Sequence, residues 1–405
     1  MRSASQGEHG MTWGFDWARR NLARACLTLG LFGLAACGDI SLPASVADSG
    51  QTIDPTKPVQ VALLLPRGSG QAGDEVLAKS LENAARLAIS DLDGVTVDLR
   101  VYATAGNPAT AATVAVQAVN EGAKIILGPV YGAAANAAGA AVAGQNVNIM
   151  AFSNNTDIAG GNVFVLGHTF ENTADRLVQY AVGQGKTKIM IVSAQDQAED
   201  KGRASIAAAM SRNGATQAGS TSFELSQDGV VKAVPTITNS AQTNGAEALF
   251  FTSGTAGALP ILTQLIVENG LDPSITQFIG LQRWDIPANA LELPPLQGGW
   301  FALPAPGPSS EFRNRYRATY SDSPHTIAGL AYDGIAAIGA LVKAGKSNAL
   351  TVSGLTQATG FAGVNGIFRL RTDGTIERGL AIATIRDNKL VVIEPAPRSF
   401  GGAGF

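Results

Sequence analysis

The chain has 405 residues, 45% of them hydrophobic and 15% charged, which is enough apolar material for buried cores in two domains. It carries 29 basic against 32 acidic residues, a formal charge of −3, and it has no basic run. Nucleic-acid binding is therefore excluded as the leading function. The low charge and the 47 glycines also argue against a coiled coil or a disordered chain. These exclusions leave a globular protein as the class of this chain.

The beginning of the chain predicts export. Three arginines between positions 19 and 24 precede an apolar stretch at 25–36, which is too short to span a bilayer because a spanning helix needs about 20 residues. The stretch ends in Leu-Ala-Ala-Cys-Gly, which resembles the lipobox of bacterial lipoproteins. The resemblance implies a signal peptide at 1–36 and lipid attachment to the thiol of Cys37. An ordinary signal peptide that happens to carry a cysteine is the alternative.

Lipid attachment would leave the mature chain without a free thiol, because Cys26 is removed with the signal peptide. Residues 37–57, rich in Ser, Asp, Pro and Gly, predict a flexible tether. Gly38 after the cysteine favours the outer membrane weakly over the inner one, and Asp39 argues against that choice. The sequence leaves open whether translation starts at Met1 or at Met11.

From position 58 on, short apolar runs alternate with amphipathic stretches at about 30 residues per unit. This alternation predicts a mostly parallel sheet with helices on both faces. In the first half we expect strands at Val59–Leu65, Val95–Tyr102, Lys124–Leu127, Asn148–Ala151 and Val163–Leu166, and helices at Asp74–Ser90, Ala109–Glu121 and Ala133–Gly144.

A second alternating unit begins near His168. We expect helices at Glu171–Gly183, Ala198–Asn213 and Ala256–Asn269, strands at Lys188–Ser193, Thr216–Phe223, Glu247–Thr252 and Gln277–Gly280, and a weak helix broken at Pro235. A patch rich in Pro and Gly at 294–308 precedes helices at Ser310–Tyr320 and Thr326–Gly345. The tail predicts antiparallel strands at Asn365–Arg371, Leu380–Arg386 and Lys389–Ile393, with turns at Asp373-Gly374 and Asp387-Asn388.

Residues 67–73 contain G-x-G-x-x-G between a predicted strand and a predicted helix, which is the context of a dinucleotide-binding loop. Two residues separate the strand from the first glycine, and the second strand does not end in the acidic residue that would bind a ribose. We therefore expect no cofactor. Gly68, Ser69 and Gly70 are predicted to line a cleft instead.

Other catalytic patterns are missing from the sequence. It contains no H-E-x-x-H, C-x-x-C, G-x-S-x-G or P-loop, and no spacing of residues that would bind a metal. His168 and His325 are the histidines left after export, and neither has a nucleophile in a recognisable context. We expect a protein that is not an enzyme, with no catalytic residues and no metal.

Four segments in this order carry a resemblance: Val61–Pro66, Ile126–Val130, Met150–Thr156 and Ala328–Gly334. Together they resemble the leucine-binding-protein-like family of type I periplasmic binding proteins, over roughly residues 58–395. The resemblance implies an α/β fold of two lobes, each a mostly parallel sheet flanked by helices, with a cleft between them.

The implied chain order divides the sequence between the lobes. The first lobe would take residues 58–167 and 283–345, and the second would take 168–282 and 346–395. Residues 396–405 would form a tail.

Further segments are similar to one branch of that family, the bacterial lipoproteins called penicillin-binding protein activators. These are Leu81–Ala85, Gly122–Pro129, Ala151–Asn154 and Val163–Gly167. This similarity implies a penicillin-binding protein as partner and a role in regulating peptidoglycan synthesis.

A ligand site in the cleft would need groups for the charges of its ligand. Receptors of this family hold a carboxylate with hydroxyls and backbone N–H groups, often at helix N-termini. Here Tyr131 follows the Gly-Pro pair, so the expected small hydroxyl is missing. Asp196 or Asp285 would accept an ammonium, and the bulky 282–284 segment would fill the cleft. The candidate cleft residues are Gly68, Ser69, Gly70, Gly128, Pro129, Tyr131, Ser153, Asn154, Asn155, Thr156, Asp196, Thr252, Gln282, Arg283, Trp284 and Asp285.

Two functions follow from these observations. The first is a non-catalytic, lipid-anchored protein facing the periplasm, which activates or scaffolds a penicillin-binding protein. The alternative is the substrate-binding lipoprotein of an ABC importer, with an amino acid or a short peptide as ligand. Neither function involves nucleic acid. In both cases the protein would contact the membrane only through its lipid.

Overall fold

The structure is a computed structural model that describes residues 48–400. The predicted signal peptide, Cys37 and most of the predicted tether lie outside the described residues. Within 48–400, no helix has the length and the apolar character that crossing a membrane requires.

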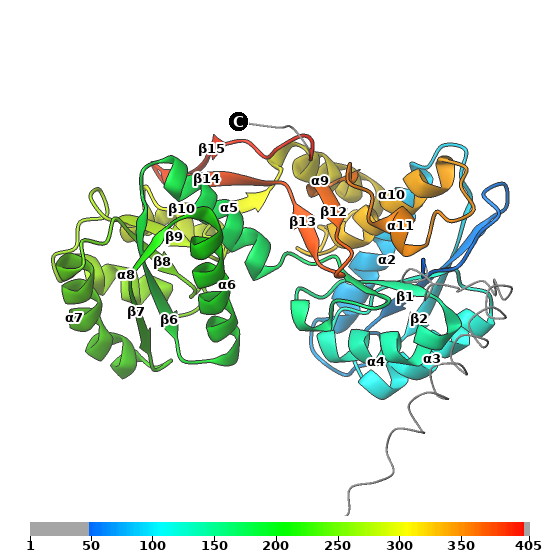
Figure 1. The fold of residues 1–405 in the computed structure, drawn as a ribbon, viewed down its shortest axis with the longest axis horizontal. Helices are drawn as coiled ribbons and strands as arrows, with labels where there is room; N and C mark the ends of the chain where they lie inside the picture. Colours follow the sequence, from blue (N-terminus) through cyan, green and yellow to red (C-terminus); the bar gives the residue numbers. More distant parts are fainter. Residues whose placement is uncertain (1–47, 401–405) are drawn as a thin grey trace, which may run out of the picture. The chain divides into compact units, whose positions relative to one another are not determined.

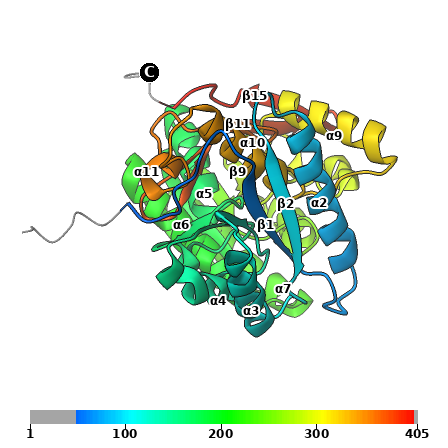
Figure 2. The ribbon, with the colours of Figure 1, turned by 90° about the vertical axis from the view of Figure 1, so that its right-hand side faces the viewer.

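The first sheet has five parallel strands in the order β2-β1-β3-β4-β5 (Figures 1 and 2). Its interior strand β1, between β2 and β3, reads VQVALLL and is buried on both faces, as expected for a parallel sheet covered by helices. The strands are β1 (Val59–Leu65), β2 (Val97–Ala103), β3 (Ile125–Leu127), β4 (Asn148–Ala151) and β5 (Val163–Val165).

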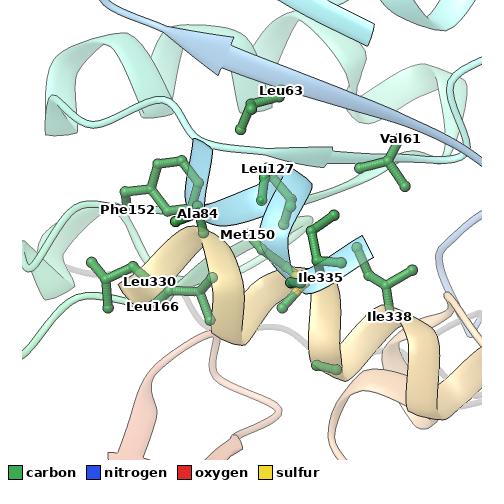
Figure 3. Close-up of a cluster of buried hydrophobic side chains, with 14 of the residues drawn as sticks. Val61, Leu63, Ala84, Leu127, Met150, Phe152, Leu166, Leu330, Ile335 and Ile338 are labelled. Carbon is green, nitrogen blue, oxygen red and sulfur yellow. The ribbon is translucent and has the colours of Figure 1, made fainter. Parts of the chain in front are cut away.

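Successive side chains of β1 point to opposite faces of this sheet and enter different cores. Val61 and Leu63 pack with helices α2 and α10, and Figure 3 shows them facing Ile335 and Ile338 of α10. Ala62 and Leu64 pack with α3 and α4. The helices are α2 (Asp74–Ser90), α3 (Pro108–Asn120), α4 (Gly132–Val142) and α10 (Gly329–Lys343).

The second sheet has seven strands in the order β15-β14-β10-β9-β8-β6-β7. Strands β10, β9, β8, β6 and β7 are parallel, and β14 and β15 add an antiparallel edge. The strands are β6 (Lys188–Ala194), β7 (Thr216–Phe223), β8 (Ala248–Phe251), β9 (Gln277–Gly280), β10 (Trp300–Pro304), β14 (Leu380–Arg386) and β15 (Lys389–Glu394).

Both faces of the second sheet are covered by helices. Side chains of α5 (Phe170–Gly183) and α6 (Gln197–Asn213) pack on one face, and those of α7 (Gln227–Thr243) and α8 (Leu259–Glu268) pack on the other. The two covered sheets confirm the expected α/β fold of two lobes.

A third, small antiparallel sheet belongs to the core of the first lobe. It consists of β11 (Phe361–Gly363), β12 (Gly366–Leu370) and β13 (Ile376–Arg378), and its Phe361 and Phe368 pack in the same core as α10. Helices α9 (Pro306–Tyr320) and α11 (Val352–Leu355) contribute to this core as well.

The lobe boundaries differ from those expected. We assigned 283–345 to the first lobe, but β10 pairs with β9 and β14 in the second sheet. We assigned 346–395 to the second lobe, but β11, β12 and β13 pack in the core of the first. The chain passes between the lobes at 166–169, 304–306 and 378–380. Strand β10 was missed because prolines and glycines surround its short apolar run.

Helix α7 was expected to break at Pro235 but continues to Thr243. Pro235 is exposed. The carbonyl that loses its intrahelical donor, four residues earlier at the exposed Val231, is therefore open to water. The helix keeps its buried face at Val234 and Ile237.

A buried ion pair ties the first lobe together. Arg378 at the end of β13 is 1% exposed and donates from Nη1 to Oδ2 of Asp333 on α10, at 2.8 Å. The Asp333 carboxylate also accepts from the Val364 backbone at 2.7 Å and from Asn365 Nδ2 at 3.0 Å. The remaining guanidinium nitrogens donate to the carbonyl of Leu166, at 3.2 and 2.8 Å. Both buried charges therefore have full sets of partners, as buried ions require.

Replacing Arg378→Leu would leave the Asp333 carboxylate buried without its cation. We expect the free energy of unfolding to fall by about 3–5 kcal/mol, measured by urea denaturation. Arg371→Leu is the matched control, because Arg371 pairs with Glu377 at the surface and should cost less than about 1 kcal/mol. Equal, small losses in both variants would contradict this account of the buried pair.

Candidate functional site

A cavity of about 710 Å³ lies where the chain passes between the lobes. His168 and Phe170 line it at the first passage, Pro304 and Ser309 at the second, and Leu380 at the third. The loop after β9, the first turns of α9 and α10, and Asn365 complete its wall. Carboxyl ends of strands and N-termini of helices thus meet at one place, which is typical of ligand sites in α/β proteins.

Slightly more than half of the cavity wall is apolar. Its larger apolar side chains are Phe170, Leu281, Ile286, Leu303, Phe312, Ile327 and Leu380. The volume lies within the range of about 300–1,000 Å³ that small-molecule sites occupy. The wall can therefore desolvate a small ligand and orient it through a few polar groups.

Two arginines reach this cavity from different elements. Arg283 follows β9 and forms a paired contact with Asp285, with Nε donating to Oδ1 at 2.9 Å and Nη2 donating to Oδ2. Arg313 on α9 donates from Nη1 to the Ser309 hydroxyl at 2.9 Å. Among residues 48–400, no carboxylate forms an ion pair with Arg313. Burial and the charges of Arg283 and Arg317 lower the pKa of Arg313, so this guanidinium sits in a positive environment.

The two histidines of the cavity are neutral at neutral pH. Burial, and then the positive charges of Arg378 and Arg283, lower the pKa of His168 to about 3. Burial also lowers the pKa of His325. With two arginines and one aspartate as the remaining ionisable lining side chains, the cavity has a net charge of +1.

Three of the predicted cleft residues line this cavity: Gln282, Arg283 and Asp285. Trp284, expected to fill the cleft, is instead fully buried in the core of the second lobe. It fits there because its ring lies against Gly280 and Gly299, where a Cβ would come within 2.1 Å of an indole atom. Its neighbours in sequence, Gln282, Arg283 and Asp285, line the cavity, whereas the tryptophan side chain enters the core.

The two aspartates proposed to accept an ammonium have other partners. Asp196 caps α6 and accepts from the backbone N–H groups of Ala198 and Glu199, at 2.8 and 2.9 Å. Asp285 is bound by Arg283. Thr252 donates its hydroxyl to Glu199, and its carbonyl accepts from Gln282 Nε2 at 3.0 Å.

The candidate residues of the first lobe gather at the carboxyl edge of its sheet, outside the lining of the cavity. Gly68, Ser69 and Gly70 form the exposed loop after β1, and Gly128 and Pro129 follow β3. A Cβ at Gly128 would lie 2.3 Å from the carbonyl oxygen of a β1 residue, so the close approach of these two segments requires glycine.

Tyr131 and the 153–156 loop are held by local contacts. The Tyr131 hydroxyl donates to Oδ1 of Asp74 at 2.5 Å, and this bond, followed by burial, raises the pKa of Tyr131 to about 12. The Ser153 hydroxyl accepts from the Asn155 backbone at 3.1 Å, and Thr156 donates to Glu171 at 2.8 Å.

Lys201 makes two further contacts with the 153–156 loop and the residue after it. Lys201 of α6 donates to Asn155 Oδ1 at 2.9 Å and forms an ion pair with Asp157. Asn154 is exposed. The contacts of Thr156 with Glu171 and of Lys201 with Asn155 and Asp157 link the two lobes.

Sequence reasoning missed Arg313, Phe312 and the role of His168 as a lining residue. No motif marks them, because they reach the cavity only through the passages of the chain between the lobes. Within 48–400, no cluster of three or more His, Cys, Asp or Glu side chains is placed to hold a metal ion.

The sequence profile of the family described as "Periplasmic binding protein" matches residues 58–389. The chain belongs to this family. Membership implies an exported, periplasmic protein, and the homologues are binding proteins, not enzymes. No curated protein sequence matches the chain.

Solved structures of low sequence identity share the fold. One, assigned to a branched-chain amino acid ABC transporter of Rhodospirillum rubrum, has a TM-score of 0.71 and 17% identity over 83% of this chain and 100% of that one. An ABC transporter substrate-binding protein from Desulfitobacterium hafniense, in complex with Leu, has a TM-score of 0.62 and 16% identity over 83% and 100%. A solute-binding protein from Rhodopseudomonas palustris BisB5, in complex with 3,4-dihydroxybenzoic acid, has a TM-score of 0.58 and 18% identity over 85% and 98%.

Proposed function

We propose that the protein is the substrate-binding component of an ABC importer and that it holds a small solute carrying a carboxylate. The observation that carries this proposal is Arg313. It is an exposed residue that lines the cavity, and its guanidinium forms no ion pair with a carboxylate among residues 48–400.

A carboxylate fits the charge of the cavity. It would bring the net charge of +1 to zero and would give the planar guanidinium of Arg313 the paired acceptors that its fork of donors matches. The first turns of α9 and α10 line the same cavity, and the positive ends of their dipoles favour an anion there.

Two of the similar structures support this ligand class. The Desulfitobacterium hafniense protein was solved with Leu, and the Rhodopseudomonas palustris protein with 3,4-dihydroxybenzoic acid. Both ligands carry a carboxylate. The similar structures described above are transport proteins by name, so the importer role has more support than activation of a penicillin-binding protein, which rests on sequence resemblance alone.

Thermal unfolding of residues 38–405 with a panel of amino acids, short peptides and simple carboxylic acids tests this function. A ligand at about 100 times its dissociation constant adds about 2.7 kcal/mol, and each kcal/mol raises the midpoint by about 2–4 °C. Arg313→Gln should weaken binding about 10- to 100-fold, because a hydrogen bond to a charged group is worth about 1.5–3 kcal/mol.

Arg100→Gln serves as the control, because Arg100 pairs with Asp98 at the surface of β2 and does not line the cavity. A panel without any shift, or equal weakening in both variants, would contradict the proposed function.

We also propose that the mature protein is anchored through lipid on Cys37, which lies outside the described residues. Cys37→Ala should leave the protein unlabelled by radioactive palmitate and move it from the membrane to the soluble fraction after cell lysis. A labelled, membrane-bound Cys37→Ala protein would show that the anchor lies elsewhere.

A further inference from the structure

We propose that the cavity selects a carboxylic acid without an ammonium group, with an aromatic or branched aliphatic body, over the α-amino acid of the same shape. The inference rests on the proposed function and narrows its ligand class. The inference follows from two observations: which charged side chains line the cavity, and which of these already form ion pairs.

Recognition of an α-amino acid requires an acceptor for its ammonium group. Of the side chains that line the cavity, only Asp285 is a carboxylate. Both of its oxygens accept from the Arg283 guanidinium, one of them at 2.9 Å. Asp285 therefore compensates Arg283, and within the described lining no carboxylate is left for a ligand's ammonium.

The surroundings of the cavity also oppose a second positive charge. Arg283 and Arg313 both line it, so an ammonium would enter beside two guanidinium groups. His168, in the same wall, shows the effect, because burial and the charges of Arg378 and Arg283 lower its pKa and keep its ring neutral. An ammonium buried there would lose its hydration without gaining an ionic partner.

The apolar side chains of the wall define the rest of the ligand. Phe170, Phe312 and Ile327 offer apolar area on different elements, and aromatic rings pack well in such surroundings. A compact acid with a phenyl or branched alkyl body would place its carboxylate at Arg313 and bury its body against this wall.

Asp74 is the competing acceptor in the first lobe. Its side chain is 5% exposed, and Oδ2 has no hydrogen-bond partner among residues 48–400. Its other oxygen accepts from Tyr131, and neither residue lines the cavity. An amino acid that used Asp74 would have to bind at the edge of the first sheet instead, which the experiment below distinguishes.

Titration calorimetry of residues 38–405 with two matched pairs of ligands tests the proposal. The pairs are 3-phenylpropionate against phenylalanine and 4-methylpentanoate against leucine, which differ only in the ammonium group. We expect at least one of the two acids to bind at least 10-fold more tightly than its amino acid. Amino acids that bind equally or more tightly would overturn the inference and leave the proposed function standing, whereas no binding by any carboxylate would contradict the proposed function itself.

Two variants separate ligand selection from a general structural effect. Arg283→Gln releases Asp285 as an acceptor, so the preference for the acid over the amino acid should fall at least 10-fold. An equal change for both members of a pair would show that Arg283 acts only on structure. Asp74→Asn should leave the preference unchanged, and loss of amino-acid binding in that variant would place the ligand at the first lobe and overturn the inference.

Discussion

The buried ion pair between Arg378 and Asp333 is the constraint on which the site depends. Arg378 ends β13 at the third passage between the lobes, and its guanidinium holds the Leu166 carbonyl at the first passage. Its backbone exchanges two hydrogen bonds with the Asn172 side chain on α5, at 3.0 and 3.2 Å. Asn365, which lines the cavity, is bound to the same Asp333. The ion pair thus joins elements of the first lobe beside the cavity, and the backbone of Arg378 connects them to α5 of the second lobe.

The electrostatics of the site follow from this arrangement. Burial, and then the charge of Arg378 that also stabilises the first lobe, lower the pKa of His168, so the histidine stays neutral and the cavity keeps the charge of its arginines. Arg283 is compensated by Asp285, whereas Arg313 is bound only to a neutral hydroxyl. The site therefore has one positive charge without a carboxylate partner, and apolar side chains line the same cavity. This combination favours an anion with a compact apolar body.

Regular local patterns made much of the fold predictable. The bounds of β1, β4, β9, β14 and α2 agree with those expected, because each element has an unbroken apolar run or an amphipathic face. The bounds of β7, a largely polar strand, agree as well. Strand β10 was missed because prolines and glycines surround its short apolar run. In the third sheet, β12 and the turn after it were expected, whereas the three-residue strands β11 and β13 are too short to show a pattern of their own. In the site, the 282–285 segment was found next to a strand end, but the burial of Trp284 depends on Gly299, which is remote in sequence. Arg313 and His168 are distant in sequence and line the same cavity only because the chain passes between the lobes several times. No local sequence pattern predicts that arrangement.

A crystal structure of residues 38–405 grown with 3-phenylpropionate is the most direct test of the central claim, that the cavity beside Arg313 holds a small carboxylate. We expect the carboxylate of the ligand within hydrogen-bond distance of the Arg313 guanidinium and its ring against Phe312 or Phe170. A ligand bound instead between the 128–131 and 153–156 loops of the first lobe would contradict the account. So would an empty cavity at a ligand concentration that saturates binding in solution.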